Sequence, residues 1–232
     1  ESVVDGKHIR FGTSGLLYRS NKLMFDHATT SLWNMLEGVP VVGERVGSGA
    51  QLTRRSMVTT TWGEWRAWHP ETTVLSLETG HERDYDEGAA YRDYFRTDRL
   101  MFQVQARDDR LDNKDEVVVM LFDSPGGDQY PLALSVDFLE DHPLFQGEAV
   151  GQSYVVETSQ DGANRVYRTG GQRFERQLDD FRVADVDGRV WRVTEDGLIA
   201  DEGPDTTLAR LPAHRAFWFG WYAQFPQTEL VR

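Results

Sequence analysis

The sequence predicts a β-rich α+β protein made of two diverged copies of a mostly antiparallel β module with short helices, in a pseudo-twofold arrangement. Three features lead to this prediction: short segments of alternating apolar and polar residues, Asp-Gly dipeptides near their ends, and a tryptophan motif that occurs twice. Alternation with a period of two is typical of strands with one buried face. Asp-Gly reverses antiparallel strands because both residues tolerate positive φ.

The predicted strands are short and are bounded by turn residues. They cover residues 7–11, 22–25, 153–157, 165–167 and 190–193. The predicted turns are Asp161-Gly162, Asp187-Gly188 and Asp196-Gly197, each of which follows or precedes such a strand. We therefore expect hairpins to dominate the fold.

One short helix is predicted at the first tryptophan motif. Thr61 is placed to cap the helix N-terminus, and Glu64, three residues later, can reach back to complete a capping box. Pro70 is expected to end the helix after about two turns.

The repeat is clearest at this motif. Residues 62–75 align without a gap with residues 218–231, so that both tryptophans, the alanine, the proline and the threonine coincide. Upstream, residues 23–33 resemble residues 182–191, and Phe11 and Phe174 open the two versions. Chance is a poor explanation, because the whole chain holds only seven tryptophans.

The repeat divides the chain into two modules. The first module is expected at residues 1–115 and the second at 116–232, and the two can pack as one globular unit. Only ten residues precede Phe11, whereas residues 117–167 form a long lead-in to the second copy. The chain is therefore expected to begin inside its first module.

Composition limits the classes of partner. The formal net charge is −13, so nucleic acid and anionic lipid surfaces are not expected to bind, because both require a basic patch. Cysteine is absent, which excludes disulfides, thiolate metal sites and cysteine nucleophiles from this chain. No run approaches the roughly 20 apolar residues that a transmembrane helix needs. No secretory signal peptide begins at Glu1.

The tryptophan motif has two possible roles. On a helix, Trp62 and Trp65 lie on one face, as do Trp218 and Trp221, and such a pair can form a stacking platform for sugar rings. The same spacing also buries a short helix against a sheet. Core packing is the favoured interpretation, because apolar residues at helical spacing usually face the core.

Ser14, between glycines, is a candidate nucleophile with His27 or His81 as base and Asp26 as the orienting group. A tight turn is the favoured interpretation, since Gly and Ser commonly form turns. The six histidines are scattered without a metal-binding pair, so no metal site, cofactor or catalytic residue is predicted.

The predicted ligand-binding residues are Ser14, Tyr18, Asp26 and Trp33. Two modules that face each other would form a cleft, which is a usual place for a ligand. These four residues supply the mixture of polar and aromatic side chains in the first copy. The ligand itself is not predicted.

Several ordered motifs resemble a known family. They are residues 11–18 (FGTSGLLY), 23–26 (LMFD), 31–33 (SLW), 61–65 (TWxxW), 69–75 and 79–85 (TGxxRDY), with residues 110–111 and 114–117 further on. Together they are similar to domain of unknown function 3179, over most of residues 7–135. The resemblance implies a bacterial or archaeal protein that is usually exported and has no established activity.

Two departures from the family pattern stand out. Members of that family commonly carry a Cys-Pro-x-Cys-like segment just upstream of the Phe-Gly-x-Ser-Gly motif, and this chain lacks it. They also usually have Tyr and Arg around the aspartate, where Phe25 and His27 stand here.

We therefore expect an extracytoplasmic binding or assembly protein, located in the periplasm or at the cell surface. Anchoring through a segment outside this chain is one alternative. The protein would act alone or with protein partners, as an accessory subunit of a larger membrane or surface complex. The alternative is a metal-dependent or hydrolytic enzyme whose active centre lies partly in an upstream segment absent here.

Overall fold

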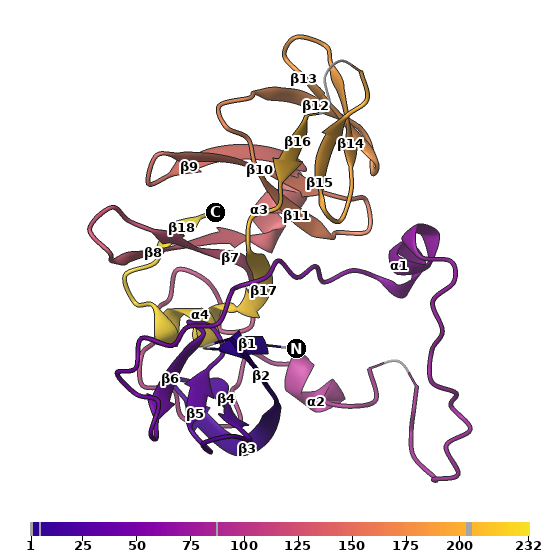
Figure 1. The fold of residues 1–232 in the computed structure, drawn as a ribbon. Coiled ribbons are helices and arrows are strands. Elements are labelled where there is room, and N and C mark those ends of the chain that lie inside the picture. Colours follow the sequence, from indigo (N-terminus) through magenta and orange to yellow (C-terminus); the bar gives the residue numbers. More distant parts are fainter. Residues whose placement is uncertain (1, 5, 87, 203–205) are drawn as a thin grey trace. The chain divides into compact units, whose positions relative to one another are not determined.

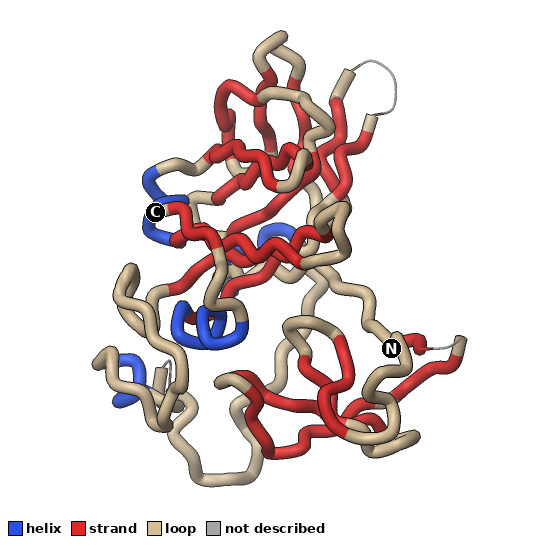
Figure 2. Tube along the Cα trace, turned by 90° about the vertical axis from the view of Figure 1, so that its left-hand side faces the viewer, coloured by secondary structure: helices blue, strands red, loops and turns tan. Residues whose placement is uncertain are grey.

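The computed structural model describes residues 2–4, 6–86, 88–202 and 206–232 (Figure 1). The chain divides into two compact units. Unit 1 comprises Glu1–Arg55, Val104–Asp108 and Phe219–Gln227, and unit 2 comprises Ser56–Gln103, Asp109–Trp218 and Thr228–Arg232. Strands and loops predominate and helices are short, which confirms the β-rich prediction (Figure 2).

Unit 1 contains a β-hairpin and a four-stranded meander. The hairpin joins β1 (Ser2–Val4) and β2 (Lys7–Ile9), and the meander runs in the order β3 (Phe11–Tyr18), β4 (Asn21–Asp26), β5 (Leu32–Asn34) and β6 (Val39–Val42). All neighbouring strands are antiparallel. Trp33 lies at the centre of a small core that also contains Val4, Ile9 and Ala50.

The described strands of unit 2 form three sheets. One is β11 (Asn164–Arg168), β10 (Gln152–Thr158) and β9 (Leu144–Ala149). The second is a meander of β12 (Phe174–Asp179), β13 (Arg182–Asp185), β14 (Val190–Val193), β15 (Gly197–Ala200) and β16 (Thr207–Ala209). The third has the order β17 (Ala213–Phe217), β7 (Glu116–Asp123), β8 (Gln129–Ser135) and β18 (Glu229–Val231). Only the pairing of β18 with β8 is parallel among these described strands.

Strand β10 separates two hydrophobic cores of unit 2. Tyr154 and Val156 pack into the core formed with β7, β8 and the helix α3 (Val136–Asp141). Val155 packs into the other core, with the β12–β15 meander. Because side chains alternate along a strand, Glu157 lies on the same face as Val155. A carboxylate is therefore placed at the edge of the second core.

The five predicted strand segments all fall in strands, apart from Arg10 between β2 and β3. Gly162 and Gly188 have φ values of +85° and +82° in the turns between β10 and β11 and between β13 and β14. Asp196-Gly197 lies at the turn from β14 to β15, as predicted, although Gly197 begins the strand. These local predictions are confirmed.

The remaining helices are α1 (Trp62–Trp68), α2 (Arg92–Phe95) and α4 (Trp218–Gln224). Thr61 caps α1 as predicted, because its side chain accepts a hydrogen bond from the Glu64 N–H at 3.1 Å. The second half of the predicted capping box is wrong. The Glu64 carboxylate instead accepts hydrogen bonds from Thr60 and Ser159 and pairs with Arg165, a stronger partner than a backbone N–H.

No described helix is both long and apolar enough to cross a membrane. The proposed module boundary between residues 115 and 116 concerns sequence similarity, which the division by contacts does not test. It stays a prediction.

Candidate functional site

A glutamate and an arginine are buried opposite each other on two strands of unit 2. Glu157 on β10 and Arg165 on β11 are opposite each other in the antiparallel register, and their exposed fractions are 0% and 2%. Charged side chains are almost never fully buried without partners, because leaving water costs several kcal/mol per ion. The two side chains must therefore have partners in their surroundings.

Arg165 is surrounded by three carboxylates. Its Nη2 lies 2.8 Å from Glu64 Oε1, its Nε lies 3.1 Å from Glu195 Oε1, and its Nη1 lies 3.7 Å from Glu157 Oε2. Arg210 pairs with the other Glu195 oxygen at 3.0 Å. We call these five residues the Arg165 network.

Two aromatic rings cover the cations of this network. The Arg165 guanidinium lies 4.5 Å from the centroid of the Trp68 ring, and that of Arg210 lies 5.3 Å from the Tyr167 ring. Arginine over an aromatic face is stabilised by the ring quadrupole, more so where water is excluded. The rings therefore fix the positions of both cations.

The burial of Glu157 favours its protonated form. Burial raises the pKa of its carboxyl to about 8, an effect that Arg165 only partly offsets and that Glu64 and Asp180 reinforce. The separation of 3.7 Å from Arg165 is too long for a hydrogen bond. With Glu157 protonated, two carboxylates, Glu64 and Glu195, face two guanidinium groups, and the network is balanced in charge.

Stability is expected to depend on pH through Glu157. Its pKa is raised from 4.5 when unfolded to about 8 when folded, so the folded protein retains a proton that the unfolded chain releases. The stability that Glu157 contributes is fully present below pH 4.5 and is lost as the pH rises to about 8. The thermal midpoint of the wild type, measured from pH 5 to 8.5, should fall relative to that of Glu157→Gln.

Glutamine is the matched control for this titration because it keeps the oxygen that accepts the hydrogen bond from Gln177 and removes the charge. Other titrating groups affect both proteins equally. Parallel curves for the two proteins over this range would contradict the assignment.

The network anchors helix α1 through one face. Glu64 and Trp68, four residues apart, lie on the same side of the helix, where Glu64 binds Arg165 and Trp68 packs on the second core. Thr61 adds a hydrogen bond to Asp161 at 3.2 Å. Trp62 and Trp65 lie on another side of the helix and are 46% and 39% exposed.

The core-packing prediction therefore holds for only one copy of the tryptophan motif. Trp218 and Trp221 of α4 are buried, with exposed fractions of 1% and 0%. In α1 the prediction is wrong, because Glu64 and Trp68 occupy the inner face and turn Trp62 and Trp65 outward.

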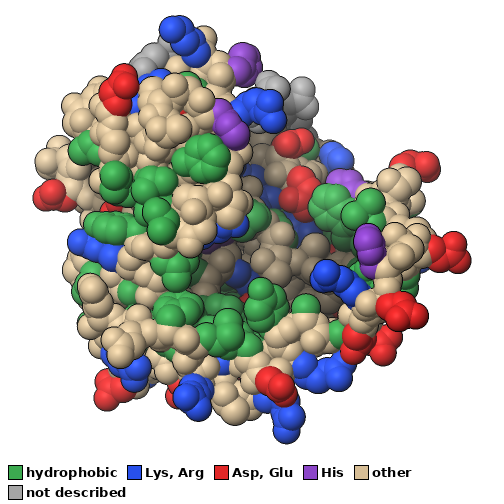
Figure 3. Space-filling model, turned by 90° about the horizontal axis from the view of Figure 1, so that it is seen from below, with side chains coloured by type: hydrophobic (Ala, Val, Ile, Leu, Met, Phe, Trp, Pro, Cys, Tyr) green, Lys and Arg blue, Asp and Glu red, His purple; other side chains and the backbone are tan. Residues whose placement is uncertain are grey.

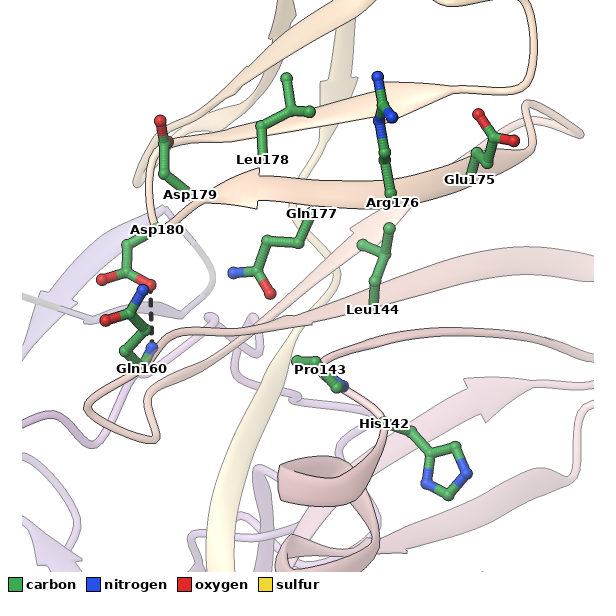
Figure 4. A pocket seen from close by; sticks show the side chains of 10 residues that line it. All are labelled: His142, Pro143, Leu144, Gln160, Glu175, Arg176, Gln177, Leu178, Asp179 and Asp180. Carbon is green, nitrogen blue, oxygen red and sulfur yellow. Dashed lines mark hydrogen bonds between the residues drawn. The ribbon is translucent and has the colours of Figure 1, made fainter.

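A surface groove adjoins the network. It consists of two hollows, about 490 and 600 Å³ in volume, that share Pro143, Gln160 and Gln177. Figure 4 shows the side chains that line the first of them. We call it the Gln177 groove. Its remaining lining side chains are mostly polar: Glu140, His142, Leu144, Thr158, Ser159, Asp161, Gly162, Glu175, Arg176, Leu178, Asp179 and Asp180.

Gln177 joins the groove to the network. Figure 4 shows its side chain pointing into the hollow, away from the side taken by Arg176 and Leu178. Its Nε2 donates hydrogen bonds to Glu157 Oε1 at 2.8 Å and to the Thr158 carbonyl at 3.2 Å. Ser159 makes a second connection, because it lines the groove and donates to Glu64 at 3.0 Å.

The predicted residues Ser14 and Tyr18 lie on β3. The Ser14 hydroxyl donates to the Leu23 carbonyl at 2.6 Å and accepts from the Leu16 N–H, within an irregularity of the β3–β4 pairing. Ser14 therefore lies within strand β3 and not in a tight turn, so that prediction is wrong, although its hydroxyl is used in local hydrogen bonds. The Tyr18 ring lies under the Arg19 guanidinium at 5.3 Å.

Asp26 and Trp33, the other two predicted residues, bind each other. Trp33 Nε1 donates to Asp26 Oδ2 at 2.9 Å, and the backbone N–H groups of Ala28 and Thr29 donate to Asp26 Oδ1. Burial raises the pKa of Asp26, but these hydrogen bonds outweigh it and hold the pKa below its ordinary value. Both side chains are buried, and their role in ligand binding stays a prediction.

The Arg165 network and the Gln177 groove were not predicted from the sequence. One signal was present: Glu157 follows Tyr154-Val155-Val156 in an apolar strand, and Arg165 begins the next one. A charged residue in a buried strand requires a partner. Within the described residues, no group of three or more His, Asp or Glu side chains is arranged to hold a metal ion.

These features define a cysteine-free, β-rich protein with a polar surface groove supported by a buried ionic network. The chain belongs to the family described as protein of unknown function DUF3179, whose model matches residues 1–228. The resemblance found in the sequence motifs is thereby confirmed. No curated protein and no solved structure matches the chain.

Proposed function

We propose that this chain is a binding protein that holds a polar ligand in the Gln177 groove. The observation that carries this proposal is the double connection of the groove to the Arg165 network, through Gln177 and Ser159. Binding sites gain affinity when their polar groups are held in place before the ligand arrives. Fixed amide and hydroxyl groups around a hollow of this size suit a small polar molecule.

Catalysis is the less favoured function. A carboxyl group with a pKa of about 8, such as that of Glu157, has the protonation state of a general acid. A general acid must, however, lie within hydrogen-bond reach of its substrate. Glu157 is fully buried and its Oε1 accepts from Gln177, so it acts on the groove only through another side chain.

An extracytoplasmic location and a role in a larger assembly are part of the proposal. The family resemblance supports export. Large exposed apolar side chains in residues 74–101 support protein partners, namely Val74, Leu75, Leu77, Tyr85, Tyr91, Phe95 and Met101. Figure 3 shows one face of the molecule, on which hydrophobic side chains are exposed among charged ones. Cell fractionation and co-purification from the native source test both points.

We also propose that the two meanders descend from one duplicated module. Trp191 Nε1 donates to Asp185 Oδ2 at 2.9 Å, the same bond that joins Trp33 to Asp26. A phenylalanine opposite each aspartate packs edge-on against each tryptophan, with ring centroids 5.5 and 5.8 Å apart. The pseudo-twofold arrangement of the copies stays a prediction.

Thermal shift measurements on the full chain test ligand binding. The probes are neutral oligosaccharides, polyamines, free amino acids and divalent cations. A compound present at 100 times its Kd adds about 2.7 kcal/mol of stability, which raises the thermal midpoint by about 5 °C or more. The shift should disappear in Gln177→Ala.

Gln129→Ala, on β8 and outside the groove, is the control variant and should keep the shift. If no probe stabilises the wild type, or if Gln177→Ala responds as the wild type does, the proposal fails.

A further inference from the structure

Helix α1 presents two exposed indole rings, and side-chain contacts hold that of Trp65 in place. Trp65 Nε1 donates to Thr72 Oγ1 at 2.9 Å, and its ring packs against the His69 ring at an interplanar angle of 37°, with centroids 4.1 Å apart. Trp62 follows the capping residue Thr61 directly. Exposed tryptophans on a short helix would ordinarily be mobile, but the inner face of α1 is held by Glu64 on Arg165. The exposed side of α1 is therefore an aromatic surface on an anchored helix.

This aromatic surface is joined to the Gln177 groove. Thr61 Oγ1 donates to the carboxylate of Asp161, and Ser159 donates to Glu64, so two lining residues of the groove are bonded to the first turn of α1. The helix that carries the exposed indole rings is thus bonded to the wall of the groove, whose other lining side chains include Gln160 and Gln177.

From this arrangement we infer that α1 and the groove together bind a neutral carbohydrate, with Trp62 and Trp65 stacking on sugar rings. The inference rests on the proposed binding function and names its ligand class. A pyranose ring has an apolar C–H face, which packs on an indole, and hydroxyl groups, which require amide and carboxylate partners. The helix supplies the first and the groove supplies the second.

The charges around the groove favour a neutral carbohydrate over an anionic one. Five carboxylates line the groove, against one arginine and one histidine: Glu140, Asp161, Glu175, Asp179 and Asp180 against Arg176 and His142. The whole chain has a formal net charge of −13. Sulfated and uronic-acid polymers would be repelled, and a second copy of this acidic chain would be repelled for the same reason.

Affinity electrophoresis of the full chain tests the inference. The gels contain one of four neutral polymers: dextran, mannan, hydroxyethyl cellulose or fully N-acetylated glycol chitosan. Heparin serves as the anionic probe. We expect at least one neutral polymer to retard the wild type and heparin not to do so. Trp62→Ala and Trp65→Ala should each weaken binding about tenfold, and Trp65→Phe should retain part of it, because a stacked ring contributes about this much.

Phe95→Ala, which removes an exposed ring from α2, is the matched control and should bind as the wild type does. If neutral polymers do not bind while another probe still gives a Gln177-dependent thermal shift, the carbohydrate inference fails and the binding function stands. Binding that survives both tryptophan substitutions also overturns it. The carbohydrate inference is also overturned if light scattering shows a dimer that Trp62→Ala or Trp65→Ala converts to a monomer. If neither assay detects a ligand, both proposals fail.

Discussion

Replacing Arg165 with methionine is expected to lower the free energy of unfolding by about 3–5 kcal/mol, because it removes one partner of a buried ion pair and leaves the others in place. Glu64 would lose a contact of 2.8 Å while remaining almost fully buried. Burial alone lowers the pKa of Arg165, but Glu157, Glu195 and Glu64 outweigh this effect and raise it, so the cation is the form that the site holds. Urea denaturation at pH 7 measures the loss.

The control for Arg165 is an ion pair at the surface of the same unit. Arg182 and Asp179 lie 2.7 Å apart, with more than a third of each side chain exposed. Arg182→Met should cost no more than about 1 kcal/mol. The double variant Arg165→Met with Glu64→Gln should recover part of the loss, because the uncompensated charge is gone. An Arg165→Met protein within 1 kcal/mol of the wild type would contradict the role given to the network.

The features that the sequence predicted correctly are local. Strand β14 coincides with the predicted segment 190–193, and the turns at Gly162 and Gly188 have the positive φ that Asp-Gly favours. The cap at Thr61 is equally local, since donor and acceptor lie three residues apart. Each of these structures is decided by neighbouring residues, which the sequence shows directly.

The burial of the tryptophan motif is decided elsewhere. The two helices share both tryptophans, yet Glu64 and Trp68 of α1 stand where α4 has Gly220 and Gln224. In α1 those two positions bind Arg165 and the second core, which turns the shared tryptophans outward. The motif alone could not predict this, because Arg165 is about one hundred residues away in the chain.

The Arg165 network could not be predicted either, because its residues are also far apart in the chain. Its members come from α1, β10, β11, the turn before β15 and the residue after β16. Only Glu157 and Arg165 belong to one hairpin, and their pairing depends on the register around Asp161-Gly162. The Gln177 groove depends on these contacts, so it could not be predicted from the sequence without predicting them first.

The two Asp–Trp pairs give the second large expected effect. Asp26→Ala and Asp185→Ala should each lower the free energy of unfolding by about 2–4 kcal/mol, because each leaves a buried indole N–H and two backbone N–H groups without their acceptor. For Asp185 those donors are Trp191 Nε1 and the N–H groups of Asp187 and Arg189. Urea denaturation of both variants provides the comparison.

Asp187→Ala is the control, because this exposed carboxylate lies in the same turn as Asp185 and should change stability by no more than about 0.5 kcal/mol. The proposed duplication implies that the two aspartates make equivalent contributions, so their losses should agree although their flanking residues differ. A loss confined to Asp26 or to Asp185 would mean that only one meander depends on the bond, and the geometric match would then be a poor argument for duplication. Equal losses would favour a module defined by its Asp–Trp bond, with the tryptophan helix free to take a new role in each copy.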